Sequence, residues 1–182
     1  MSKQRDFIDD DLADWLRRQH VFFVATAPES KDGYLNCFPK GGSCFRVLGP
    51  AEVAYQGYTG KGAETVAHPR ENGRIVLMFC AFEGKPEIAR LHGQGEVILP
   101  GDTAFDGIAE HFLPNPGTRA FVRVSVTRIS TSCGFAVPLL DFREDRETLD
   151  KWALSKEERG LKEYRTQKNV RSIDGLPAFD SK

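Results

Sequence analysis

Short runs of apolar residues, some continuous and some alternating with polar residues, recur along most of this chain, a pattern typical of β-strands. Such runs occupy residues 21–27, 34–40, 45–58, 74–82, 87–99 and 121–131. The third run is interrupted by Gly49-Pro50 and therefore predicts two short strands. Gly93 and Gly95 lie inside the fifth run, which predicts a β-bulge or a close approach of a neighbouring backbone there. Only the turn residues EGKP separate the fourth run from the fifth, so these two predict a β-hairpin.

Helical signals lie mainly near the two ends of the chain. In residues 9–20, Leu12, Trp15 and Leu16 fall on one helical face. Residues 101–112 and 146–169 predict two further helices, the second of them highly charged. A brief helix follows residue 63 and is expected to end near Pro69, because proline lacks the amide that continues a helix.

These elements predict a mainly β fold, a six- to seven-stranded antiparallel barrel with flanking helices. The strands do not alternate with full crossover helices, which argues against a doubly wound parallel sheet. We expect one domain over residues 1–182. It divides into an N-terminal helix at 1–20, a barrel at 21–142, and a C-terminal helix and tail at 143–182.

Charge and composition exclude several classes of function. The chain holds 25 basic and 26 acidic residues with no basic stripe, so we expect no nucleic-acid partner. No apolar run approaches the ~18 residues of a membrane span, and the polar start lacks the apolar core of a signal peptide. The chain is therefore expected to be cytoplasmic, with free thiols and no membrane partner. The four histidines are scattered, so we expect no metal site.

One strand-to-helix turn, YTGKGAET at residues 58–65, has the composition of an anion-binding site. Gly60 and Gly62 let backbone amides converge before a helix N-terminus, and Lys61 and Thr65 can point into the same space. It lacks the spacing of a Walker A loop. The alternative is an ordinary turn with a solvated lysine.

A second cationic loop occurs in CFPKGGSCFRVL, where Lys40 lies between Pro39 and the pair Gly41-Gly42. Arg46 follows on the next strand. Adjacent glycines let a flat ligand approach the backbone, although the same residues also suit a plain tight turn. Two cationic loops at strand ends suit a phosphorylated aromatic cofactor.

Taken in order, several motifs carry a resemblance to a known family. They are FFVATAPESKDGYLNCFPKGG, AYQGYTGKGAETVAHPRENGRIVLMFCAF, LHGQGEV, TSCGFAVP and KNVRSIDGLP. Together, from about residue 21 to residue 177, the chain resembles one branch of the pyridoxamine 5′-phosphate oxidase-like proteins, which are FMN-binding split β-barrels. The resemblance implies a homodimer that holds FMN at the subunit interface.

The resemblance also nominates binding residues by position. Pro39, Lys40 and Gly41 would lie along the isoalloxazine ring, and Gln94 would reach the flavin edge. The phosphate would lie against Tyr58, Thr59, Lys61, Glu64 and Thr65. Arg171 and Ser172 would close over the site from the partner subunit, and Asn36, Arg46 and His92 are weaker nominations.

The chain also departs from the true oxidases. Lys61-Gly62-Ala63 stands where those enzymes carry a serine followed by adjacent Arg-Lys, and the ending RSIDGLPAF lacks their Trp-rich, Arg-containing terminus. Vitamin B6 oxidation is therefore not implied, and we expect an FMN-dependent oxidoreductase of other specificity. The alternatives are a flavin carrier or redox sensor without turnover, or a split barrel that binds deazaflavin or haem, with His92 or His111 as the axial ligand. No residue indicates the substrate or the electron donor.

Overall fold

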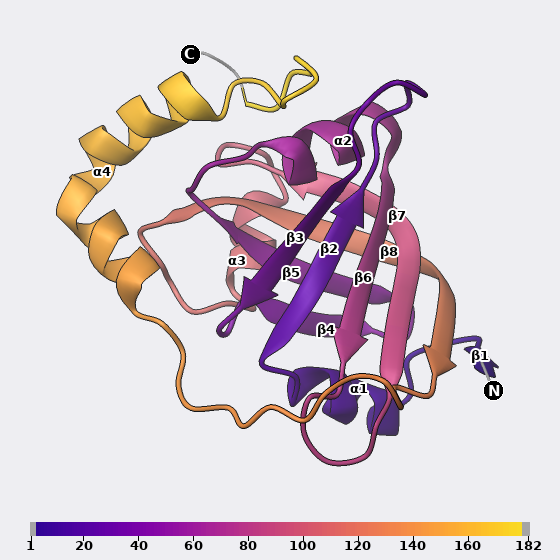
Figure 1. The fold of residues 1–182 in the computed structure, drawn as a ribbon. Helices are drawn as coiled ribbons and strands as arrows, with labels where there is room; N and C mark the ends of the chain where they lie inside the picture. The colour runs from indigo at the N-terminus through magenta and orange to yellow at the C-terminus, as the bar shows by residue number, and fades with distance from the viewer. Residues whose placement is uncertain (1–2, 180–182) are drawn as a thin grey trace.

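The computed structural model describes residues 3–179, which form a curled antiparallel sheet with helices around it (Figure 1). The strand order is β3-β2-β6-β7-β8-β5-β4, and β1 pairs with β8 beside this path. The strands are β1 (Lys3–Arg5), β2 (Val21–Thr26), β3 (Asn36–Gly41), β4 (Phe45–Gly49), β5 (Glu52–Tyr58), β6 (Arg74–Cys80), β7 (Ile88–Ile98) and β8 (Thr118–Ser132). The helices are α1 (Asp10–Arg17), α2 (Glu64–Asn72), α3 (Phe105–Ala109) and α4 (Thr148–Lys168). The predicted mainly β, split-barrel fold is confirmed.

The sheet curls around a core of aromatic and branched side chains. Every second residue of β2 is buried, which is the period expected of a strand with one face in the interior. Phe22 and Phe79 stack with ring centroids 5.1 Å apart, and Phe45 meets Phe79 edge-on at 4.9 Å. This packing joins β2, β6 and β4, so the two ends of the strand order face each other across one core.

The helices close the two ends of the half-barrel, as Figure 1 shows with α1 at one end of the strands and α2 at the other. Asp9 caps α1 by accepting a hydrogen bond from the Leu12 amide, and Leu12 and Leu16 are buried against the sheet. In α2 the buried residues include Val66 and Ala67. Among the described residues, no helix combines the length and the apolar character needed to cross a membrane.

The bulge predicted around Gly93 is confirmed. The register between β7 and β8 shifts between His92 and Gly93. A Cβ atom on Gly93 would lie 2.2 Å from the carbonyl oxygen of Ser125 on the neighbouring strand. Only glycine lets the two backbones approach this closely.

The expected end of the short helix near Pro69 is wrong. Helix α2 continues through Pro69 to Asn72 and ends at Gly73, whose left-handed φ of 73° suits glycine. The missing proline amide removes one hydrogen bond inside the helix, and the helix continues because that residue is buried against the sheet. The helix expected over 101–112 is also shorter, because only Phe105–Ala109 is helical. Strand β1 was not predicted.

The C-terminal part forms an arm that leaves the barrel and returns to it. Figure 1 shows α4 outside the sheet and the following tail beside α2. Ala178 packs with Val66 and Ala67, and Leu176 and Phe179 lie against the same cluster. The tail therefore lies on the helix that follows the YTGKGAET loop.

Candidate functional site

The two cationic loops predicted from the sequence meet at one cavity of about 650 Å³, which we call the main cavity. The β3–β4 side contributes Pro39, Lys40 and Gly41 to its lining, and the loop after β5 contributes Tyr58, Thr59, Gly60 and Lys61. Arg119 at the start of β8 and residues 144–146 complete one wall. Six of the predicted site residues thus surround one space: Pro39, Lys40, Gly41, Tyr58, Thr59 and Lys61.

The ammonium group of Lys40 lies over two aromatic rings. Its Nζ lies 4.4 Å from the ring centre of Phe38 and 5.5 Å from that of Tyr55. Within residues 3–179, no carboxylate forms an ion pair with it. Burial, with a smaller contribution from the nearby Arg119 charge, lowers the pKa of Lys40 to about 8. Lys40 therefore offers the cavity a cation without a fixed counter-ion.

The hydroxyl group of Tyr55, whose ring lies near Lys40, is also without a hydrogen-bond partner among the described residues. Its side chain is buried, and burial raises the pKa of its hydroxyl well above its usual range. Buried hydroxyl groups are normally paired, so this one is an exception inside the core, close to a lysine that lines the main cavity.

Side chains from outside the 58–65 loop donate hydrogen bonds to its carbonyl oxygens. Arg119 donates to the carbonyl oxygens of Gly60 at 3.3 Å and Gly62 at 2.9 Å. Asn169, at the end of α4, donates to the same Gly60 oxygen at 2.9 Å. In the described chain, the amides of Gly60, Lys61 and Gly62 meet no hydrogen-bond acceptor. Unpaired amides ahead of a helix N-terminus are groups that bind phosphate oxygens in other proteins, and two of these three residues, Gly60 and Lys61, line the main cavity.

Arg119 is the main residue that sequence reasoning missed. It is only 5% exposed, and its Nε has no hydrogen-bond partner among the described residues. Burial lowers its pKa to about 10, so it stays charged at neutral pH. No local signal marks it, because it contacts a loop that lies 57 to 59 residues earlier in the chain.

Tyr58 and Thr59 line the cavity while their polar atoms hold the local structure. The Tyr58 hydroxyl donates to Gln56 Oε1 at 3.1 Å, and burial raises the pKa of that hydroxyl to about 12. The Thr59 hydroxyl donates to the Gly117 carbonyl oxygen at 2.9 Å and accepts from Arg165 Nε at 2.8 Å. These contacts fix the start of the loop against β8 and α4.

Comparison with known proteins places the chain in a family. The family model for pyridoxamine 5′-phosphate oxidase matches residues 8–133. The chain belongs to this family. A curated relative, the pyridoxamine 5′-phosphate oxidase family protein ustO of Aspergillus flavus, is 41% identical over 191 residues, covering 96% of this chain and 76% of that protein.

Solved structures agree with the family fold. The HupZ protein of Group A Streptococcus, in a structure at 1.98 Å resolution, has a TM-score of 0.54 and 21% identity, covering 69% of this chain and 99% of that chain. A second HupZ structure, at 1.70 Å, has a TM-score of 0.53 and 22% identity, covering 67% of this chain and 91% of that chain. At these identities the likeness concerns the fold alone.

The remaining nominated residues lie outside the lining of the main cavity. Glu64 accepts from the Ala63 amide and from the Ile173 amide, both at 3.0 Å, so its carboxylate fixes the start of α2 and the tail. Thr65 is buried in the first turn of α2. Gln94 is exposed on β7 beside Gly73.

The nominated tail residues bind other residues of the tail. Arg171 is exposed and donates to the Gly175 carbonyl oxygen at 2.7 Å. Ser172 is buried, and its hydroxyl accepts from the Leu176 amide at 3.1 Å. Asn36 and His92 line a separate cavity of about 480 Å³ between β2, β3, β6 and β7. No histidine of the described chain lines the main cavity, and no group of three metal-ligating side chains occurs in that part of the chain.

Proposed function

We propose that this chain is an FMN-binding oxidoreductase whose cofactor binds in the main cavity. The observation that carries the proposal is the loop at 60–62. Its carbonyl oxygens are bound by Arg119 and Asn169, while its amides meet no acceptor within the described residues. The loop is open to solvent, so its amides are free to bind water or the oxygens of an anionic group.

The residues present fit FMN in charge where the phosphate would bind. The charged side chains that line the main cavity are Lys40, Lys61, Arg119 and Arg146, with the carboxylates of Glu144, Asp145 and Asp150. The amides of Gly60, Lys61 and Gly62 and the Lys61 side chain would hold the phosphate. Arg119, whose Nη atoms bind the loop carbonyl oxygens, adds a buried positive charge beside this loop. Pro39, Lys40 and Gly41, which line the same cavity, would lie along the flavin ring. The bound flavin would supply hydride or electron transfer, and the Lys40 charge would favour its reduced, anionic form.

A homodimer is part of the proposal. Four apolar side chains between β8 and α4 are exposed in the single chain: Phe135, Leu139, Leu140 and Phe142. Phe135 is 83% exposed, and Tyr34 and Leu35 before edge strand β3 are exposed as well. Exposed apolar residues in such numbers favour a protein partner, and a second copy of this chain is the expected one. Sedimentation velocity at micromolar concentration measures this directly: a dimeric species is expected, and a monomer would contradict it.

The test of the cofactor compares FMN with riboflavin, which lacks the phosphate. Apoprotein should bind FMN much more tightly than riboflavin, as measured by quenching of flavin fluorescence. Lys61→Ala should weaken FMN binding about fivefold, equivalent to ~1 kcal/mol, and leave riboflavin binding unchanged. Lys85→Ala, which removes an exposed lysine in the β6–β7 turn, is the matched control and should change neither affinity. Equal affinities for FMN and riboflavin, or no uptake of either, would contradict the proposal.

Turnover separates an oxidoreductase from a carrier or sensor at the same site. FMN-loaded protein should oxidise NADH or NADPH repeatedly when an electron acceptor is present. A single stoichiometric reduction without further turnover would favour the carrier or sensor.

A further inference from the structure

Lys40 combines a position in the lining of the main cavity with surroundings that favour a neutral amine. Its Nζ lies over the rings of Phe38 and Tyr55, and no carboxylate of residues 3–179 forms an ion pair with it. Removal from water favours the neutral form of a lysine, and attraction to two ring faces offsets only part of that effect. Loss of the proton therefore costs Lys40 less free energy than it costs a solvated lysine.

The titratable groups nearest to Lys40 do not restore its charge. Burial, followed by repulsion from the Arg119 guanidinium on β8, lowers the pKa of Lys40 to about 8. Burial also raises the pKa of the Cys44 thiol to about 11 and that of the Tyr55 hydroxyl well above its usual range. Both groups are therefore neutral near pH 8, and neither supplies a negative charge to the ammonium group.

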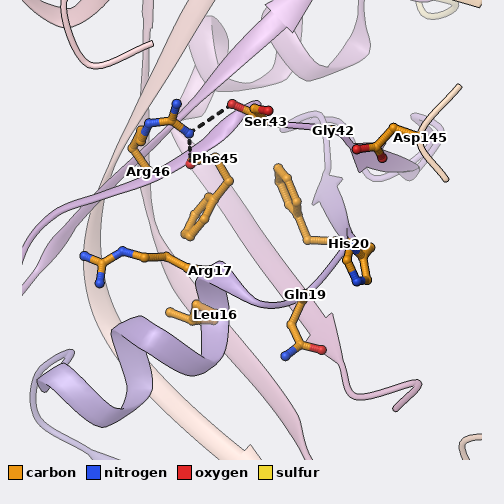
Figure 2. A pocket seen from close by; sticks show the side chains of 10 residues that line it. Leu16, Arg17, Gln19, His20, Gly42, Ser43, Phe45, Arg46 and Asp145 are labelled. Carbon is orange, nitrogen blue, oxygen red and sulfur yellow. Dashed lines mark hydrogen bonds between the residues drawn. The ribbon is translucent and has the colours of Figure 1, made fainter. Parts of the chain in front are cut away.

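The charged groups farther along the cavity walls leave the Lys40 amine without an acidic partner. They are Lys61, Glu144, Asp145, Arg146 and Asp150. Within the described chain, none of these carboxylates forms an ion pair with Lys40. Arg46 follows on β4, and Figure 2 shows its guanidinium bound to the carbonyl oxygens of Ser43, at 3.0 Å, and Phe45, at 2.7 Å. Arg46 therefore binds backbone groups of its own segment.

The surroundings of Lys40 are those of a nucleophilic amine. Lysines that attack carbonyl groups are activated by removal from water or by a neighbouring cation, and Lys40 meets both conditions. Several apolar side chains line the cavity with it: Phe38, Pro39, Leu113 and Leu149. Walls of this kind accept the hydrocarbon part of a small molecule.

We propose that Lys40 is a nucleophile that binds a small aldehyde or ketone covalently in the main cavity. The lone pair of Nζ attacks the carbonyl carbon, and a C–N bond forms. The carbonyl oxygen then leaves as water with the two protons of the amine, and the product is an imine. This reaction consumes no oxidant or reductant. It goes beyond the proposed function, because imine formation requires no flavin.

The test traps the imine with propionaldehyde and cyanoborohydride, which reduces the C=N bond to a stable secondary amine. The purified full-length protein is labelled at pH 7, and mass spectrometry of its peptides locates the propyl groups. Lys40 should react about tenfold faster than Lys85, an exposed lysine in the β6–β7 turn, because more of the Lys40 amine is neutral than in a solvated lysine. The labelling rate of Lys40 should level off above about pH 8. Equal labelling of Lys40 and Lys85 at pH 7 would overturn the proposal.

Saturating FMN provides a second arm, which rests on the proposed function. Bound FMN should slow the labelling of Lys40 about fivefold or more and leave that of Lys85 unchanged, because the cofactor and the aldehyde would share the main cavity. Unchanged labelling of Lys40 in protein that fluorescence shows to hold FMN would overturn the placement of the reaction in that cavity. Failure of FMN to bind would contradict the proposed function, and the comparison of the two lysines without FMN would still decide this proposal.

Discussion

Asn169 donates a hydrogen bond from its side-chain amide to the carbonyl oxygen of Gly60, across 109 residues of sequence and 2.9 Å of space. This contact joins the end of α4 to the loop that we propose binds phosphate. Asn169 is fully buried, and its Oδ1 has no partner among the described residues. The C-terminal arm therefore shapes the site at both ends of α4: Asn169 holds the loop, and Leu149 and Asp150 line the main cavity.

Replacing Asn169 with alanine should destabilise the protein and weaken FMN binding together. The change removes one of the two donors to the Gly60 carbonyl oxygen, and losing one such hydrogen bond typically costs about 0.5–1.5 kcal/mol. Urea denaturation should show a lower midpoint with an unchanged slope, and fluorescence titration should show weaker FMN binding. Gln167→Ala, an exposed change on the same helix, should alter neither quantity. Full FMN affinity in Asn169→Ala would mean that the arm does not support the loop.

Arg119 should matter more to FMN binding than any exposed arginine. It holds two carbonyl groups of the loop and carries a buried charge, so Arg119→Ala should weaken FMN binding about tenfold to hundredfold, equivalent to ~1.5–3 kcal/mol. Arg119→Lys keeps the charge but loses the forked hydrogen bonds, and should fall between the wild type and alanine.

The control for Arg119 lies on the same strand. Arg123 pairs with Glu96 on the surface at 2.6 Å, and Arg123→Ala should leave FMN binding unchanged. Thermal unfolding of each variant separates lost binding from lost folding. Equal losses in the folded Arg119 and Arg123 variants would show that Arg119 has no special role.

Two kinds of signal predicted the strands. β2 and β6 are short apolar runs with β-branched and aromatic residues, and β8 alternates apolar with polar residues in its middle. β1 could not be predicted, because Lys3–Arg5 has no apolar residue and joins the sheet only by backbone pairing with β8. The true end of α2 could not be predicted either. It depends on the left-handed conformation of Gly73, and the residues around Gly73 in the sequence do not dictate that conformation.

The two loops of the candidate site were also predictable, because glycine and lysine at strand ends carry a local signal. Arg119 and Asn169 were not, since each acts on the carbonyl groups of a loop that is distant in sequence. Glu64 shows the opposite case: it lies in the predicted motif, yet its carboxylate binds the Ala63 and Ile173 amides. A motif locates a loop, but only the fold decides which side chains face the cavity.

Lys40 should make stability depend on pH in the alkaline range. Its pKa is about 8 in the fold, against 10.5 in the unfolded chain. Between these values the unfolded chain binds a proton that the folded chain lacks, so the contribution of Lys40 to stability rises with pH. Relative to Lys40→Met, the wild type should therefore become more stable from pH 8 to pH 10.5, as measured by urea denaturation across that range.

The titration of Lys40 should lower FMN affinity as pH rises, whereas it raises stability. Lys40 carries its positive charge below its pKa, so FMN affinity should begin to fall above pH 8 in the wild type. Lys40→Met should bind FMN more weakly at neutral pH and lose this step. Identical pH profiles for both proteins would show that Lys40 does not titrate beside the flavin.

The bulge at Gly93 should be the most sensitive glycine of the sheet. A methyl group there would meet the Ser125 carbonyl oxygen at 2.2 Å, so Gly93→Ala must push β7 and β8 apart and should cost about 1–3 kcal/mol. Gly107→Ala is the matched control: Gly107 lies inside α3, and an added Cβ meets no atom within 4 Å among the described residues. Because alanine favours a helix, that control should be stabilised by about 0.5–1 kcal/mol. Urea denaturation of both variants should therefore give changes of opposite sign. A neutral Gly93→Ala would mean that the bulge can relax without disturbing the pairing of β7 with β8.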